Sequence, residues 1–308
     1  MKQEKGTDGI VTAILTYVLW GILPMYWKTI AQVPAHEILA HRIFWSFIFM
    51  AVLVILMKKI GQVSNECRQA MGSPKKLLGV ASGALLISIN WFIYIWAVND
   101  NRVIETSLGY YINPLVSVLI GIIILEEKLS FWQVVSVLLA AIGVLNMTLH
   151  FGSVPWVSLA LAVSSGFYGL CKKVAGLTAI TSMMLETLLI APFAFIYLLY
   201  LHSYGSGFVL TLSTTSWLLV CTGIVTVIPL LLFSYSATKL SLTVLGLFQY
   251  VMPTIGLILG VFLYHESFTT IHFISFMFIW LALILFSLSK TSNLIKAKRI
   301  ISQKRWLK

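Results

Sequence analysis

Long apolar stretches separated by short polar segments recur along nearly the whole chain of 308 residues. A helix needs about 20 apolar residues to cross a hydrocarbon core roughly 30 Å thick, and each stretch is about that long. Backbone amides find no water to bond with in lipid, so a helix is the expected conformation of each stretch. The pattern therefore predicts an all-α integral membrane protein with ten transmembrane helices. We place them at residues 9–29, 38–57, 77–98, 103–125, 131–149, 155–174, 181–201, 217–236, 243–264 and 270–289.

The ten stretches fall into two related groups of five. When the chain is shifted by 139 residues, the fourth stretch falls on the ninth: Tyr111 meets Tyr250, Pro114 meets Pro253, Gly121 meets Gly260 and Glu127 meets Glu266. Five crossings is an odd number, so the second copy must lie inverted in the membrane. Inverted repeats are typical of secondary carriers, because the two copies can exchange conformations and so alternate access between the two sides. We predict one repeat over residues 9–149, a second over 155–289 and a basic tail over 290–308.

The fourth and ninth stretches carry polar and small residues on one helical face. That face is formed by Tyr110, Asn113, Ser117 and Gly121 in the fourth stretch and by Gln249, Met252, Gly256 and Gly260 in the ninth. Small residues four apart let helices approach closely, so we expect these two helices to cross near the pseudo-twofold axis. Pro114 and Pro253 predict a kink in each helix. Asn113 and Gln249 could line a transport pathway or simply take part in packing, and the sequence leaves both interpretations open.

Composition and charge agree with a membrane location. Hydrophobic residues make up 59% of the chain and charged residues 10%, with a mean hydropathy of +0.95, whereas a soluble domain is about a quarter charged. If both termini are cytoplasmic, 18 of the 21 lysines and arginines lie on the inner side, as the positive-inside rule requires. The net charge of +11 then reflects topology rather than nucleic-acid binding. The basic tail could contact anionic lipid or only anchor the last helix.

Several segments resemble a known family. The first runs from Tyr17 to Ser46 and contains Trp20-Gly21, Pro24, Tyr26-Trp27-Lys28, Pro34, His41-Arg42 and Trp45. Others are 90–94, 107–115, Glu186-Thr187 and Gln249-Tyr250. In these segments the chain resembles the RarD branch of the drug/metabolite transporter superfamily, which has two EamA-like repeats. The likeness covers nearly the whole chain and implies a ten-helix carrier with a central cavity between the repeats. It implies no particular substrate, because members of the superfamily carry chemically diverse solutes.

Two charged residues lie inside apolar stretches, where a charge costs roughly 2.5–3.5 kcal/mol on insertion scales and needs a partner or a function. Arg42 lies near the outer end of the second stretch, next to His41 and one turn before Ser46. We interpret His41, Arg42 and Trp45 as lining an external vestibule; the alternative is that they reach the lipid headgroups. Glu186 lies 144 residues after Arg42, at the equivalent place in the second repeat. It could carry a coupling proton, pair with Arg42, or stay protonated and hydrogen-bonded to a neighbouring helix.

Aromatic and amide side chains complete the predicted site. Rings that line a cavity accept planar or amphipathic solutes, while Arg42 and His41 favour an anionic group. The candidate substrate-binding residues are His41, Arg42, Trp45, Asn90, Trp91, Tyr94, Tyr110, Asn113, Gln249 and Tyr250. We expect a cavity bordered by the second, third, fourth, seventh, eighth and ninth spans, with Asn90, Tyr110, Asn113 and Gln249 exposed to it.

These features predict a secondary transporter, an exporter or permease for a small metabolite or drug-like solute in a bacterial plasma membrane, as a monomer or a homodimer. A membrane-embedded enzyme is less well supported, because His36-Glu37 and His41 are spaced one residue too far apart for the HExxH zinc motif. A channel would be expected to carry a pore motif or rings of charge, and none is evident. Cys67, Cys171 and Cys221 lack metal-site spacing, and no P-loop is present, so we expect no metal, no cofactor and no ATP coupling.

Overall fold

The computed structural model describes residues 2–125, 131–151, 154–205, 207, 213–240, 248–286 and 288. Within these ranges the chain is almost entirely helical and contains no strand, which confirms the all-α class. Six of the described helices are long and apolar enough to cross a membrane, and two shorter apolar helices accompany them. The count of ten spans stays a prediction, because the ninth lies partly outside the described residues. The basic tail over 290–308 and Glu127 also lie outside them.

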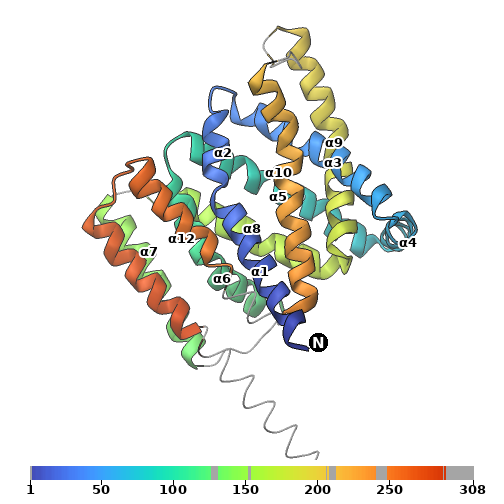
Figure 1. The fold of residues 1–308 in the computed structure, drawn as a ribbon. Helices are drawn as coiled ribbons and strands as arrows, with labels where there is room; N and C mark the ends of the chain where they lie inside the picture. The colour runs from blue at the N-terminus through green and yellow to red at the C-terminus, as the bar shows by residue number, and fades with distance from the viewer. Residues whose placement is uncertain are drawn as a thin grey trace, which may run out of the picture.

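The helices form one bundle (Figure 1). In chain order they are α1 (Lys2–Gly21), α2 (Leu23–Thr29), α3 (Ala35–Leu56), α4 (Ile60–Met71), α5 (Pro74–Asn99), α6 (Val103–Leu125), α7 (Phe131–Phe151), α8 (Trp156–Ala175), α9 (Ala179–Ser203), α10 (Thr214–Lys239), α12 (Val251–Ile258), the π-helix η1 (Leu259–Leu263) and the helix Thr270–Phe286. The last of these lies beside α7 at one edge of the bundle, where Asn146 Nδ2 donates to Ser275 Oγ at 2.9 Å.

The first predicted span, residues 9–29, is present as one apolar segment that consists of two helices. α1 ends at Gly21, and α2 begins at Leu23 with Pro24 in its first turn, where the missing proline N–H leaves no helical bond unmade. A Cβ on Gly21 would come within 2.8 Å of the Ile255 side chain, so only glycine allows α1 to approach α12 so closely at this point. The break directs α2 towards α5, against which it packs.

Contacts between helices occur in matched pairs. α8 packs against α5 and α6, and α1, its counterpart under the predicted repeat, packs against α10 and α12. In the same way α3 packs on α10 and α9 packs on α5. These pairings are those expected of two related five-helix units, although the repeat boundaries and the inversion stay predictions.

The fourth and ninth spans meet as the small residues suggested. A Cβ on Gly256 would lie 2.6 Å from Ser107 Oγ, and one on Gly260 would lie 2.9 Å from Ile104, so both glycines permit close contact between α6 and α12–η1. The predicted contact face of α6 included Ser117, but Ser117 is exposed. α6 instead contacts α12–η1 through the face that carries Ile104 and Ser107.

The two prolines differ in effect. α6 continues unbroken through Pro114. α12 begins only at Val251, two residues before Pro253, after a turn at Gln249 and Tyr250. Proline cannot donate to the carbonyl four residues earlier, which for Pro253 is that of Gln249, and this explains why regular helix is interrupted there. The predicted distortion of the ninth span is present as a break, whereas the fourth span carries its proline without interruption.

The amphipathic helix α4 was not predicted, because it is too short and too polar to span a membrane. Glu66 of α4 accepts hydrogen bonds from the backbone N–H of Thr178 at 3.0 Å and from its hydroxyl at 2.9 Å. Thr178 is the N-cap of α9, so α4 holds the start of α9 in place. Burial is the largest single influence on the pKa of Glu66 and raises it, but hydrogen bonds from Gln62, Thr178 and Thr181 together outweigh it and lower the pKa.

A second carboxylate makes a similar contact elsewhere in the bundle. Glu266 accepts from the backbone N–H groups of Val103 at 2.7 Å and Ile104 at 2.8 Å, at the start of α6. Free N–H groups and the positive end of the helix dipole both favour a carboxylate in this position. Glu266 therefore ties the segment that follows η1 to α6.

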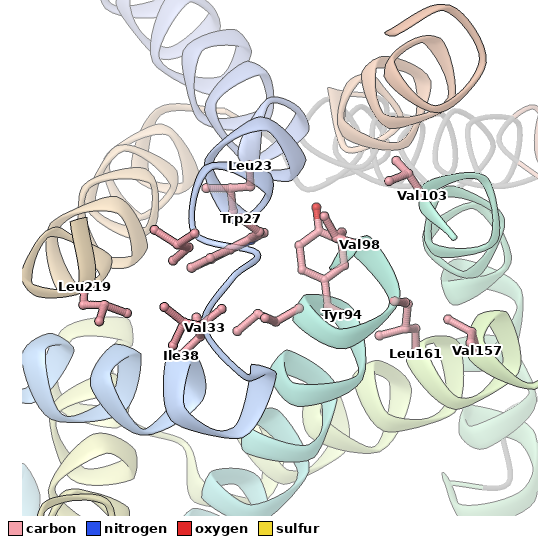
Figure 2. Packing of buried hydrophobic residues seen from close by; sticks show 13 residues of the cluster. Leu23, Trp27, Val33, Ile38, Tyr94, Val98, Val103, Val157, Leu161 and Leu219 are labelled. Atoms are coloured by element: carbon pink, nitrogen blue, oxygen red, sulfur yellow. The ribbon is translucent and has the colours of Figure 1, made fainter. Parts of the chain in front are cut away.

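A buried apolar cluster surrounds α2 (Figure 2). Trp27, Ile30 and Ile38 are fully buried, and α10 contributes Leu219 while α5 contributes Tyr94. These side chains fill the bundle at the end where α2 lies, which the predicted topology places on the outer side.

Candidate functional site

Arg42 lies inside the bundle, two turns from the start of α3, with only 5% of its surface exposed. Two indole rings pack against its guanidinium: Cζ lies 4.0 Å from the ring centroid of Trp91 and 5.0 Å from that of Trp27. Nε donates to Thr226 Oγ1 of α10 at 3.0 Å. Nη1 is buried and has no hydrogen-bond partner among the described residues. The guanidinium is thus fixed in orientation but retains an unused donor.

Tyrosine side chains surround this guanidinium. The rings of Tyr94 and Tyr110 meet edge to face with centroids 5.7 Å apart. Both lie close enough to Arg42 for their hydroxyls to interact with its charge, as does Tyr26. The Tyr26 hydroxyl donates to the backbone oxygen of Leu218 in α10. The structure therefore brings together Arg42 and the predicted rings of Trp91, Tyr94 and Tyr110, and adds Trp27 and Tyr26, which sequence reasoning did not include.

His41 does not join this cluster. Trp45 Nε1 donates to His41 Nδ1 at 3.3 Å, and His41 Nε2 lies 4.0 Å from Glu37 Oε1. Successive residues of a helix point in different directions, so His41 and Arg42 belong to different faces of α3. In this conformation His41 and Trp45 therefore contact each other but not the Arg42 cluster, and a vestibule lined by all three residues stays a prediction. Arg42 is covered by Trp27 and reaches neither an open vestibule nor the headgroups.

Asn90 is a packing residue in this structure. It is 2% exposed, and Nδ2 donates to the backbone oxygen of Leu161 at 3.1 Å, to Ser164 Oγ at 2.8 Å and to Ser165 Oγ at 3.1 Å. All three acceptors belong to α8, so the amide joins α5 to α8. The expectation that Asn90 is exposed to a cavity is wrong, because its donors are already used between helices.

The candidates on α6 and before α12 form a separate group. The rings of Tyr111 and Tyr250 stack with centroids 6.4 Å apart, and the Tyr111 hydroxyl bonds to Thr254 Oγ1 at 2.6 Å. Tyr111 also contacts Phe276 of the helix Thr270–Phe286. Tyr250 packs against the buried cluster that contains both Tyr111 and Phe276. Asn113 and Gln249 are half-buried, and their role in a pathway stays a prediction.

Glu186 is paired with Lys172, not with Arg42. Lys172 Nζ lies 2.9 Å from Oε1 and 3.1 Å from Oε2. Ser182 Oγ donates to Oε1 at 2.8 Å and the Tyr168 hydroxyl to Oε2 at 2.9 Å. The side chain of Glu186 is 3% exposed and that of Lys172 30%. Of the three alternatives for Glu186, pairing with Arg42 is wrong, because the carboxylate is occupied by donors from α8 and from its own helix.

The alignment of the two repeats indicates that Lys172 lies near Glu186. A shift of 144 residues places Arg42 on Glu186, and a shift of 145 residues places Trp27 on Lys172. Each pair is in contact in the structure, Arg42 with Trp27 and Glu186 with Lys172. The two clusters therefore occupy matched places in the two predicted repeats, with an aromatic ring in one where the other has an ammonium group.

A small pocket lies between these two clusters. Its lining comes from α3, α5 and α9 and comprises Ile43, Ile87, Ser88, Trp91, Met183, Glu186, Thr187 and Ile190. Trp91 also covers Arg42, and Glu186 also pairs with Lys172. The pocket therefore adjoins both charged clusters, with an apolar wall between them.

The model of the EamA-like transporter family matches residues 7–149 and again residues 153–288. The chain belongs to the EamA-like transporter family. As a member of it, the chain is a multi-pass membrane transporter. The uncharacterized transporter YojE of Bacillus subtilis is 44% identical to this EamA-like chain, over 94% of the chain and 97% of the relative. Protein RarD of Escherichia coli is 41% identical over 93% and 96%. These relatives confirm the resemblance to the RarD branch.

More distant similarities agree with this assignment. The chloramphenicol-sensitive protein RarD of Pseudomonas aeruginosa is 26% identical over 90% of this chain and 93% of its own length. One solved crystal structure superposes on the chain with a TM-score of 0.56 at 18% identity. The superposition covers 94% of this chain and 98% of the other. At that level of identity the superposition shows a shared fold.

Proposed function

We propose that this EamA-like transporter is a secondary carrier that moves a small amphipathic solute with an anionic group across the bacterial plasma membrane. The observation that carries the proposal is Arg42, a buried cation that forms no ion pair among the described residues and keeps one donor unused. An uncompensated charge inside a membrane protein is costly and commonly marks a substrate pathway. The planar guanidinium matches a carboxylate or phosphate, so a substrate anion would supply the missing counter-charge.

The aromatic surroundings of Arg42 support the amphipathic character of the solute. Trp91 presents its ring both to the guanidinium and to the pocket between α3, α5 and α9. In this conformation the pocket has room for about one water molecule. The apolar portion of a solute whose anionic group reaches Arg42 would therefore pack against Trp91 and the aliphatic wall only after the pocket widens. Binding sites for small molecules commonly combine such apolar walls with a few directed polar groups.

Asymmetry between the matched helix pairs supports alternating access. A Cβ on Gly223 of α10 would lie 2.5 Å from the backbone of Trp45 in α3, so these helices are as close as glycine allows. The matched pair, α9 and α5, instead borders the pocket. A carrier built from two repeats changes access when each repeat adopts the arrangement of the other. In this conformation buried side chains close the end of the bundle beside α2. The predicted topology places this end on the outer side of the membrane.

Glu186 is the proposed coupling residue. Its carboxylate is balanced by Lys172 while α8 and α9 are together. A carboxylate that loses its cation in an apolar environment tends to take up a proton. Separation of α8 from α9 would therefore link proton uptake to the change in access, and the proton gradient would drive accumulation.

Flux measurements test this proposal. Comparison of the metabolites of cells with and without the protein selects candidate solutes, and the purified full-length chain is then assayed in proteoliposomes. Arg42→Gln should raise KM for anionic solutes, whereas Arg68→Gln, which removes an exposed charge on α4, should not. Glu186→Gln should abolish gradient-driven accumulation and leave exchange between equal pools. Unchanged selectivity in Arg42→Gln would contradict the anionic substrate class, and an unchanged pH response in Glu186→Gln would contradict coupling.

A further inference from the structure

A second buried donor near Arg42 also has no acceptor. Trp27 is fully buried, and its Nε1, like Nη1 of Arg42, has no hydrogen-bond partner among the described residues. The indole lies against the guanidinium, with 5.0 Å between Cζ and the ring centroid. A buried donor without an acceptor costs about 1–3 kcal/mol, and folded proteins leave few of them. Two side chains in contact thus each carry one unused donor, and a single acceptor could serve both.

Three of the neighbouring side chains that carry oxygen already make hydrogen bonds or an ion pair, whereas the buried Ser46 Oγ, one turn along α3, has no partner among the described residues. Thr226 Oγ1 accepts from Nε of Arg42, on a different edge of the guanidinium from Nη1. The Tyr26 hydroxyl is directed at the backbone oxygen of Leu218. The Glu186 carboxylate is held by Lys172. Among the described residues, therefore, neither donor has a carboxylate within ion-pair distance.

The chemistry of the two donors selects the acceptor. An indole N–H can only donate, and so can a guanidinium, so the group between them must accept twice. Water could accept from both but would leave the positive charge of Arg42 unbalanced in an apolar interior. An oxyanion accepts from both and also balances the charge.

We propose that Trp27 Nε1 and Arg42 Nη1 together bind one oxyanion, the carboxylate or phosphate group of the transported solute. The inference rests on the proposed function and adds Trp27 as a residue that determines specificity. Trp27 belongs to α2, which Tyr26 fastens to α10, so the oxyanion is bound at the closed end of the bundle. A neutral amide of the same shape should bind poorly, because its NH₂ group would meet two donors.

Binding to the full-length protein in nanodiscs tests the proposal at constant chloride concentration. The probes are benzoate, indole-3-acetate and phenyl phosphate, each compared with a neutral partner: benzamide, indole-3-acetamide or benzyl alcohol. Trp27→Phe keeps a ring against Arg42 but removes the N–H. It should weaken the anionic probes about ten-fold, the equivalent of one hydrogen bond to a charged group, and leave the neutral probes unchanged. Trp132→Phe, at an exposed ring of α7, is the matched control. Arg42→Gln should abolish the preference for anions.

The outcomes separate this inference from the proposed function. If Trp27→Phe binds anions as well as Trp132→Phe does while Arg42→Gln does not, Trp27 is no ligand and the carrier proposal stands. If wild-type protein prefers none of the anionic probes, both fail. If Trp27→Phe does not fold, wild-type protein with ¹⁵N-labelled indoles gives the answer. At least one indole N–H resonance should move downfield with anionic probes only, and no such shift would overturn the inference.

Discussion

Replacing Lys172 with methionine should destabilise the protein by about 3 kcal/mol at pH 7, because it leaves a buried carboxylate without its cation. Glu186 is 3% exposed and would retain only the hydrogen bonds from Ser182 and Tyr168. Glu186→Gln should cost less, about 1–2 kcal/mol, because the ammonium group of Lys172 is 30% exposed and can turn to water.

The double variant carries the diagnostic information. Lys172→Met combined with Glu186→Gln removes both charges, so it should be no less stable than Glu186→Gln alone. The implied coupling energy is at least about 3 kcal/mol, well above the value for an exposed ion pair.

Unfolding by sodium dodecyl sulfate in mixed micelles, followed by tryptophan fluorescence, measures these differences on the full-length chain. Lys75→Met, which removes an exposed lysine at the start of α5, should change stability by less than about 0.5 kcal/mol. If Lys172→Met is no worse than Lys75→Met, or if the two single losses add up in the double variant, the ion pair does not hold α8 and α9 together.

Three further predictions concern packing and capping. Gly223→Ala should lower the unfolding temperature markedly, because its Cβ would lie 2.5 Å from the backbone of Trp45, whereas Gly169→Ala, with nothing within 4 Å, should not. Asn90→Leu should destabilise the protein by about 1–3 kcal/mol through the unpaired acceptors it leaves on α8, with no change in substrate KM; a selective KM effect would return Asn90 to the binding site. Glu66, whose pKa is lowered by its hydrogen bonds, should contribute stability at neutral pH that is lost as pH falls through its folded pKa, below about 4.3. Thermal unfolding of wild type and Glu66→Gln between pH 3 and 7 should therefore converge at the acid end, and a constant difference would contradict the cap.

The membrane class, the positions of six of the predicted spans and the family could be predicted from the sequence. Apolar runs of about 20 residues are a local property, since their length and polarity decide whether a segment is stable in hydrocarbon. Close contact between the fourth and ninth spans could also be predicted from Gly256 and Gly260. The break between α1 and α2 has a signal in Gly21 and Pro24, which interrupt the first apolar stretch. α4 was not predicted because its sequence contains no long apolar run.

The partners of the buried polar residues were decided only by the tertiary structure. Arg42 and Glu186 occupy equivalent places in the sequence, yet one packs between tryptophans and the other pairs with Lys172. Asn90 was assigned to a cavity, and its amide is used by α8. Helical spacing fixes which residues share a face, but not which helix that face meets or at what rotation. The long-range contacts of these side chains depend on how the helices cross, and that is set by the packing of the whole bundle.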